Sequence, residues 1–124
     1  MADTLTSRGP DDVGVWLDEA CGVALAHRRL SVVELSAAGH QPMSSASGRY
    51  VIVFNGEIYN HLDLRRDLAQ RAPQQWRGHS DTETMLACID AWGIAATLTR
   101  TVGMFALALW DRDERSLTLA RDRL

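Results

Sequence analysis

Alternating apolar and polar residues predict strands at both ends of the chain. Val13 to Leu17 and Val23 to Leu30 are separated by the polar turn Asp18-Glu19-Ala20, which is typical of a hairpin. Near the other end, Met104 to Trp110 and Ser116 to Ala120 are joined by a short polar linker. Because a parallel crossover needs a longer connection, this linker predicts a second antiparallel hairpin.

A further strand is predicted at Tyr50 to Phe54, which is an apolar run with no polar face. Such a strand must be covered on both sides, and the same holds for Met104 to Trp110. Antiparallel strands buried on both faces indicate two stacked sheets with helices outside them. The segment Ser36 to Ser47 is rich in Ser, Ala and Gly, so we expect a loop there.

Helical periodicity marks three segments. Leu62 to Arg71 has leucines on one face and is followed by a proline. Ser80 and Glu83 have the spacing of a capping box, which predicts the start of a second helix that ends near Gly93. A short third helix is predicted at Ile94 to Thr99. The expected fold class is therefore α+β.

Composition places the chain among ordinary small globular domains. It has 124 residues, of which 46% are hydrophobic and 23% charged, so we expect one core. The net charge is -3, and the basic residues are all arginines scattered among carboxylates. That pattern gives no basic stripe for nucleic acid, and no apolar stretch approaches the roughly 20 residues that span a bilayer. We expect neither a nucleic-acid nor a membrane partner, and a cytoplasmic location.

The two cysteines, Cys21 and Cys88, fall in a predicted strand and a predicted helix, with no second thiol close to either. This spacing fits neither a metal site nor a redox pair. Both are expected to be small core residues, because free cysteine is commonly buried. The sequence predicts no metal and no cofactor for this chain.

Short motifs spread along the chain carry a family resemblance. In order they are Arg8-Gly9-Pro10-Asp11-Asp12, His27-Arg28-Arg29-Leu30-Ser31, Gly39-His40-Gln41-Pro42-Met43, Asn55-Gly56-Glu57-Ile58-Tyr59-Asn60, Ser80-Asp81-Thr82-Glu83, Gly103-Met104-Phe105-Ala106 and Arg121-Asp122-Arg123-Leu124. Together they resemble the asparagine synthetase family. The similar part is its amino-terminal glutaminase half, a class II glutamine amidotransferase of the N-terminal-nucleophile hydrolase fold. The resemblance implies an αββα sandwich, in which two antiparallel sheets lie between helical layers.

The resemblance assigns an oxyanion hole to Asn55 and Gly56. The Asn55 side-chain amide and the Gly56 backbone N–H would donate to the negative oxygen that develops on the glutamine carboxamide. Taken alone, Asn-Gly is also typical of a tight hairpin turn. The residues from Glu57 to Asn60 favour the oxyanion hole.

Three charged residues match family positions that hold the rest of glutamine. Arg29 would bind the α-carboxylate, because a planar guanidinium can meet both oxygens. Asp81 would accept the α-ammonium, and Glu57 would line the same pocket. Each has a simpler alternative: a surface arginine at a strand end, a carboxylate favoured by the helix dipole, and a turn or capping contact near the following helix.

Family members begin with a catalytic cysteine, whereas this sequence begins Met1-Ala2-Asp3 only a few residues before Arg8. The sequence therefore predicts that residues 1–124 are a partial class II glutamine amidotransferase domain, incomplete at both ends. On this reading the nucleophile strand and an ATP-dependent synthetase domain are absent. We expect such a chain to be inactive alone.

The resemblance also implies the partners of the longer protein. They are L-glutamine and a synthetase domain that uses ATP and Mg²⁺ to amidate aspartate or a similar carboxylate, and a homodimer is left open. The alternative function is a non-catalytic module that binds glutamine through Arg29, Asn55, Glu57 and Asp81.

Overall fold

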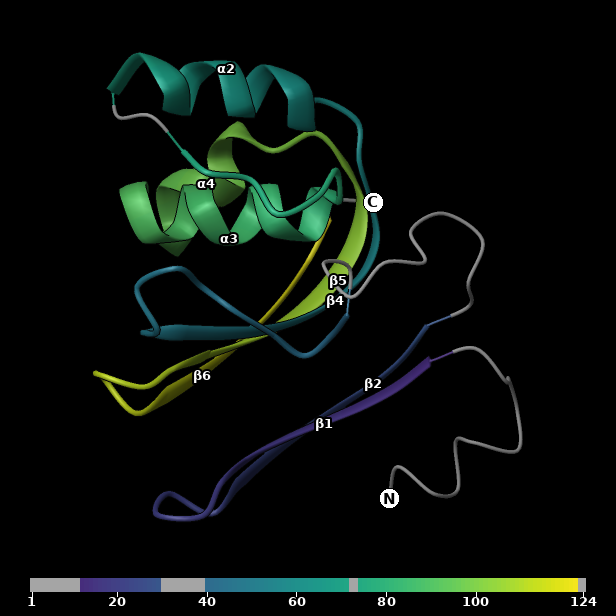
Figure 1. Ribbon diagram of the computed structural model, residues 1–124, viewed down its shortest axis with the longest axis vertical. Coiled ribbons are helices and arrows are strands. Elements are labelled where there is room, and N and C mark those ends of the chain that lie inside the picture. The colour runs from purple at the N-terminus through teal and green to yellow at the C-terminus, as the bar shows by residue number, and fades with distance from the viewer. Residues whose placement is uncertain (1–11, 30–39, 72–73, 123–124) are drawn as a thin grey trace.

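The computed structural model describes residues 12–29, 40–71 and 74–122 (Figure 1). The strands are β1 (Asp12–Asp18), β2 (Val23–Arg29), β3 (Met43–Ser44), β4 (Tyr50–Ile58), β5 (Gly103–Asp111) and β6 (Ser116–Arg121). The helices are α2 (His61–Arg71), α3 (Asp81–Trp92) and α4 (Ile94–Arg100). The motif Arg8 to Asp11 lies outside the described residues. None of the described helices combines the length and apolar content needed to cross a membrane.

The strands form two antiparallel sheets, as the sequence predicts. One is the two-stranded hairpin of β1 and β2, and the other has four strands in the order β3-β4-β5-β6. The predicted hairpin near the end of the chain is confirmed, because β5 pairs with β6 from Ala106↔Arg121 to Asp111↔Ser116. All three predicted helices are present, and the α+β fold class is confirmed.

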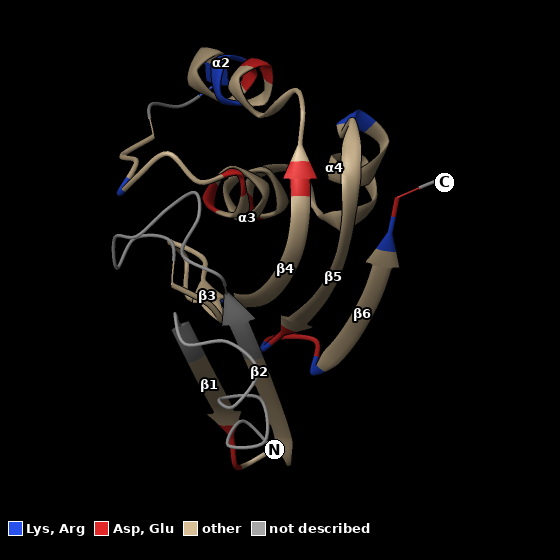
Figure 2. Ribbon diagram, turned by 90° about the vertical axis from the view of Figure 1, so that its right-hand side faces the viewer, with Lys and Arg blue, Asp and Glu red and all other residues tan. Residues whose placement is uncertain are grey.

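The helices cover one face of the four-stranded sheet (Figures 1 and 2). Side chains alternate along β4, so Ile52 and Phe54 point to the helical side and are almost completely buried. They pack with Leu64 of α2 and with Met85 and Ile89 of α3 in the main hydrophobic core. This core fixes α3 against β4.

The hairpin packs on the opposite face of the sheet. Leu25 from β2, Val51 from β4 and Trp110 from β5 form a second, smaller core. The Trp110 indole also donates a hydrogen bond of 3.2 Å to the Asp18 carboxylate. The molecule therefore has the two stacked sheets that the sequence predicts, with one helical layer on the outside.

The second helical layer of the expected sandwich is not among the described residues. On the outer face of the hairpin, Val15 and Leu17 are 53% and 57% exposed. They alternate with Trp16, which packs against the smaller core, so their side chains point away from the four-stranded sheet.

Three local predictions are wrong. The run of strand residues in β4 does not stop at Phe54 but continues to Ile58. The expected loop from Ser36 to Ser47 contains the short strand β3, because Met43 pairs with Ile52 of the neighbouring strand. Cys21 lies in the turn between β1 and β2 and not in a strand. By contrast, Cys88 is fully buried as predicted, and this burial raises the pKa of its thiol to about 12.

Candidate functional site

The predicted oxyanion residues lie inside β4. Asn55 pairs with Ala106 and Gly56 with Phe105, and the ladder continues to Ile58↔Gly103. The alternative of a tight Asn-Gly hairpin turn is therefore wrong, because the chain does not reverse there. Both residues are exposed, so they remain accessible to a small ligand.

Gly56 is required by the close approach of β5. Its φ is 132°, a conformation that residues with a side chain rarely adopt. A Cβ on Gly56 would overlap the Met104 carbonyl oxygen and lie 2.6 Å from the Phe105 Cα. The same holds on the opposite strand, where a Cβ on Gly103 would overlap the Glu57 carbonyl oxygen. At this point the two backbones approach so closely that only glycine fits on either strand.

Asn55 and Glu57 point to the hairpin side of the sheet, since alternate residues of a strand share a face. Glu57 is exposed, and its side chain makes no hydrogen bond or ion pair within the part of the chain that the structure describes. Its carboxylate is therefore available to a cationic group.

Asp81 lies in the first turn of α3, directly beside the end of β4. One of its oxygens, Oδ2, accepts a hydrogen bond of 2.8 Å from the Ile58 backbone N–H. Its other oxygen has no partner among the described residues. This hydrogen bond brings Asp81 next to the segment Asn55 to Glu57, so four of the five predicted site residues share one end of the sheet.

Arg29 is the last residue of β2, and its backbone pairs with Asp12. Its side chain lies outside the described residues, so its role as the carboxylate ligand stays a prediction. The strand itself lies on the hairpin side of the sheet, which is the face that carries Asn55 and Glu57. Figure 2 shows β2 and β4 running in roughly the same direction.

Gln41 positions this site, and the sequence analysis did not single it out. The side chain is buried, with 5% of its surface exposed. Its Oε1 accepts a hydrogen bond of 2.6 Å from the Phe54 N–H, and its Nε2 donates one of 3.2 Å to the Thr82 hydroxyl. Gln41 therefore joins the residue before Asn55 to the residue after Asp81. An amide side chain suits this bridge because it carries a donor and an acceptor on separate atoms.

Asn60 anchors the far end of β4. Its Nδ2 donates a hydrogen bond of 2.8 Å to the Arg100 carbonyl, and its Oδ1 accepts one of 3.0 Å from the Val102 N–H. These bonds hold the turn after β4 against the start of β5. The asparagine that closes the motif from Asn55 to Asn60 thus has a structural task.

The start of α3 is held by a network of side chains. Ser80 caps the helix, because its hydroxyl accepts a hydrogen bond of 3.2 Å from the Glu83 N–H. The second half of the predicted capping box differs, since the Glu83 carboxylate reaches back to the N–H groups of Arg77 and Gly78 at 2.7 and 3.0 Å. Arg65 donates to the Gly78 and Ser80 carbonyls from the other side. Partial burial lowers the pKa of its guanidinium.

Neither cysteine lies at this site. Cys21 is in the β1–β2 turn, and Cys88 is buried in α3 under the sheet. Within residues 12–29, 40–71 and 74–122, no group of three or more His, Cys, Asp or Glu side chains is arranged to hold a metal ion.

Comparison with known proteins decides the family. A family model described as a glutamine amidotransferase domain matches residues 1–124. The chain belongs to this family. The glutamine amidotransferase domain is 41% identical, over its whole length, to asparagine synthetase (glutamine-hydrolysing) 3 of Bacillus subtilis and covers 20% of that protein. It is 38% identical, again over its whole length, to asparagine synthetase B (glutamine-hydrolysing) of Escherichia coli and covers 21% of it.

A solved structure agrees with the fold of the glutamine amidotransferase domain. It is the glutamine phosphoribosylpyrophosphate amidotransferase of B. subtilis, complexed with ADP and GMP, with a TM-score of 0.64 and 20% sequence identity. The alignment covers 80% of this chain and 23% of that one. The chain is thus homologous to the glutaminase part of asparagine synthetases and spans about a fifth of the length of these relatives.

Proposed function

We propose that the domain binds L-glutamine at the Asn55 end of β4, as the glutaminase part of an asparagine synthetase-like amidotransferase. The observation that carries this proposal is the hydrogen bond from the Ile58 N–H to Asp81. It places a carboxylate with one open oxygen beside Asn55, Gly56 and Glu57.

In the proposed complex the two ends of glutamine meet different groups. The α-ammonium lies between Asp81 and Glu57, and the α-carboxylate meets the Arg29 guanidinium. The side-chain carboxamide lies along β4, where Asn55 and Gly56 donate hydrogen bonds to its oxygen. When a nucleophile attacks the carboxamide carbon, that oxygen becomes negative, and loss of one such donor typically costs about 2.7 to 4 kcal/mol of transition-state stabilisation.

In the whole protein, the ammonia released from glutamine would amidate aspartate or a similar carboxylate. We assign the acceptor site, ATP and Mg²⁺ to the remainder of that protein. For the complete domain we propose the αββα sandwich architecture, in which a second helical layer covers Val15 and Leu17. A cytoplasmic location and a homodimer stay predictions.

A second function is favoured by the position of the two cysteines. Cys21 lies in the turn at the other end of the hairpin, and Cys88 is buried, with a thiol pKa raised to about 12. Neither can attack a carboxamide held at Asn55. We therefore propose that this chain by itself binds glutamine without hydrolysing it.

Isothermal titration of the purified chain with L-glutamine tests both proposals. We expect binding by the parent chain, loss of binding in Arg29→Ala, and unchanged binding in Arg66→Ala, whose side chain pairs with Asp63 on the exposed face of α2. An assay for released ammonia runs in parallel. A folded, monodisperse chain that does not bind glutamine contradicts the proposed site, and steady ammonia release contradicts binding without hydrolysis.

A further inference from the structure

A pocket among the described residues lies at the opposite end of the sheet from Asn55. It has a volume of about 640 Å³ and lies between the β1–β2 turn and the β5–β6 turn, with Asp18, Arg112 and Arg115 among its lining residues. Arg49, which also lines it, precedes Gly56 by seven residues of extended chain, a distance of about 23 Å. The pocket is therefore separate from the proposed glutamine site.

Several charges in this pocket are already satisfied. Arg49 donates two hydrogen bonds to Asp111, at 2.9 and 2.8 Å, and lies 3.6 Å from an Asp113 oxygen. The Asp90 carboxylate accepts hydrogen bonds from the Ser47 N–H and hydroxyl at 3.2 and 2.6 Å. Arg49, Asp111 and Asp113 thus pair with one another, whereas the Asp90 carboxylate is held by neutral donors.

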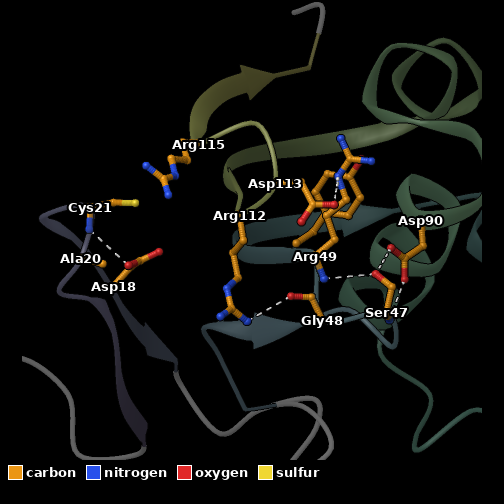
Figure 3. Close-up of a pocket in the computed structure, with 11 residues that line it drawn as sticks. Asp18, Ala20, Cys21, Ser47, Gly48, Arg49, Asp90, Arg112, Asp113 and Arg115 are labelled. Atoms are coloured by element: carbon orange, nitrogen blue, oxygen red, sulfur yellow. Dashed lines mark hydrogen bonds and ion pairs between the residues drawn. The ribbon is translucent and has the colours of Figure 1, made fainter.

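Three other charged groups that line the pocket have no partner of opposite charge among the described residues. The Arg115 side chain makes no hydrogen bond or ion pair with any described residue, and the Arg112 guanidinium donates only to the Gly48 carbonyl, at 3.2 Å. Asp18 accepts hydrogen bonds from the Cys21 N–H and the Trp110 indole, and no cation among the described residues pairs with it. Figure 3 shows the Arg115 side chain extending toward the turn that carries Asp18 and Cys21, while the Arg112 side chain extends toward Gly48.

The backbone at Arg115 supports a ligand role for its side chain. Its φ of 53° makes it the one non-glycine residue at positive φ in the described part of the chain. This left-handed conformation favours Gly or Asn in a hairpin turn. Strained residues of this kind cluster at functional sites. The turn itself gives no reason for an arginine at this position.

We propose that this pocket binds an acidic α-amino acid, which carries one ammonium and two carboxylates. The two open guanidiniums of Arg112 and Arg115 meet the two carboxylates, and the open carboxylate of Asp18 meets the ammonium. A guanidinium suits a carboxylate because its planar fork donates two parallel hydrogen bonds. A simple anion would leave Asp18 unpaired, and a neutral amino acid would leave one arginine unpaired.

Isothermal titration with L-aspartate, in the presence and absence of saturating L-glutamine, tests this proposal. We expect L-aspartate to bind in both conditions, whatever the outcome at the glutamine site. Succinate lacks the ammonium and L-asparagine lacks the second carboxylate, so each should bind about tenfold more weakly or worse. Equal binding of succinate, L-asparagine or inorganic phosphate would overturn the proposal, as would no binding of L-aspartate by the folded chain.

Variants separate ligand binding from folding. Arg115→Gly removes the guanidinium and suits the left-handed backbone, so the urea midpoint should stay equal or rise while L-aspartate affinity falls about tenfold or more. Asp18→Asn should weaken L-aspartate by a similar factor and leave succinate unchanged. Arg66→Ala serves as the control and should bind like the parent chain. Unchanged L-aspartate affinity in both Arg115→Gly and Asp18→Asn would overturn the proposal.

Discussion

Gly56 belongs to the proposed oxyanion hole, and the close approach of β5 also requires glycine at this position. Replacing it with alanine forces a Cβ into the Met104 carbonyl and against the Phe105 Cα at 2.6 Å. The positive φ of 132° adds strain of its own. We expect Gly56→Ala to lower the free energy of unfolding by about 2 kcal/mol or more, measured by urea denaturation.

Gly22 provides the matched control for this substitution. It also has a positive φ, of 69°, but a Cβ there would meet nothing within 4 Å. Gly22→Ala should therefore lose only the backbone contribution of about 1 kcal/mol. Equal losses in the two variants would show that the approach of β5 is not what requires glycine at position 56.

Asp81 has two tasks that a single substitution can separate. In Asp81→Asn the side-chain oxygen can still accept the hydrogen bond from the Ile58 N–H, but the negative charge is lost. We expect the urea midpoint to change little and glutamine affinity to fall about tenfold or more, because an ammonium loses its charged partner. Asp81→Ala should lose both stability and affinity. If Asp81→Asn binds glutamine like the parent chain, Asp81 acts only as a helix-terminal residue.

Asp111 makes stability depend on pH. The hydrogen bond from Arg49 is the main cause that lowers the pKa of this buried carboxyl, and backbone N–H groups of Glu114 and Asp113 add to it. Because the folded-state pKa lies below the unfolded one, the stabilisation is complete above about pH 4 and is lost as pH falls through the folded pKa. The gap in urea midpoint between the parent chain and Asp111→Asn should therefore be widest near neutral pH and narrow below about pH 4. A constant gap from pH 7 to pH 3 contradicts this account.

Between elements, Gln41 is the side chain that joins β4 to α3. Gln41→Leu keeps a similar volume but leaves the buried Phe54 N–H without its acceptor. An unsatisfied buried donor costs about 1 to 3 kcal/mol, and we expect a loss of this size in urea denaturation. Gln70→Leu, on the exposed face of α2, is the control and should change stability little. A loss in Gln41→Leu no greater than in the control contradicts the bridging role.

Local patterns predicted most elements, and the strand segments that they missed have a common cause. The extension of β4 through Asn55, Gly56 and Glu57 depends on pairing with β5, about fifty residues away in sequence. Polar residues and a glycine interrupt the apolar run, so a local pattern ends the strand at Phe54. The tie between Gln41 and Thr82 spans 41 residues and leaves no local signal either.

The site was predicted by resemblance more than by physical pattern. Composition and periodicity alone allowed a turn at Asn55-Gly56 and an ordinary helix-terminal carboxylate at Asp81. The structure rejects the turn and brings Asp81 to the end of β4. The ligand roles of Arg29, Asn55, Gly56, Glu57 and Asp81 stay predictions, because a fold positions groups without showing what they bind.

At the scale of the whole molecule, the hairpin covers only part of the sheet. It shields Val51 and Trp110, whereas Met104, Leu117 and Leu119 on the same face are 56%, 50% and 74% exposed. Figure 2 shows β6 standing clear of the hairpin. Exposed apolar surface of this kind marks a place where another element packs. In the proposed complete sandwich, further strands beside β1 and β2 would cover it.

The central claim is that glutamine binds at the Asn55 end of β4. The most direct test is a titration of ¹⁵N-labelled chain with L-glutamine, followed by the backbone amide signals in ¹H–¹⁵N NMR spectra. We predict saturable shifts at Asn55, Gly56, Glu57 and Asp81, with the amides around Arg112 and Arg115 unchanged. Absence of shifts in a folded chain, or shifts confined to the Arg112 and Arg115 end, would contradict the account.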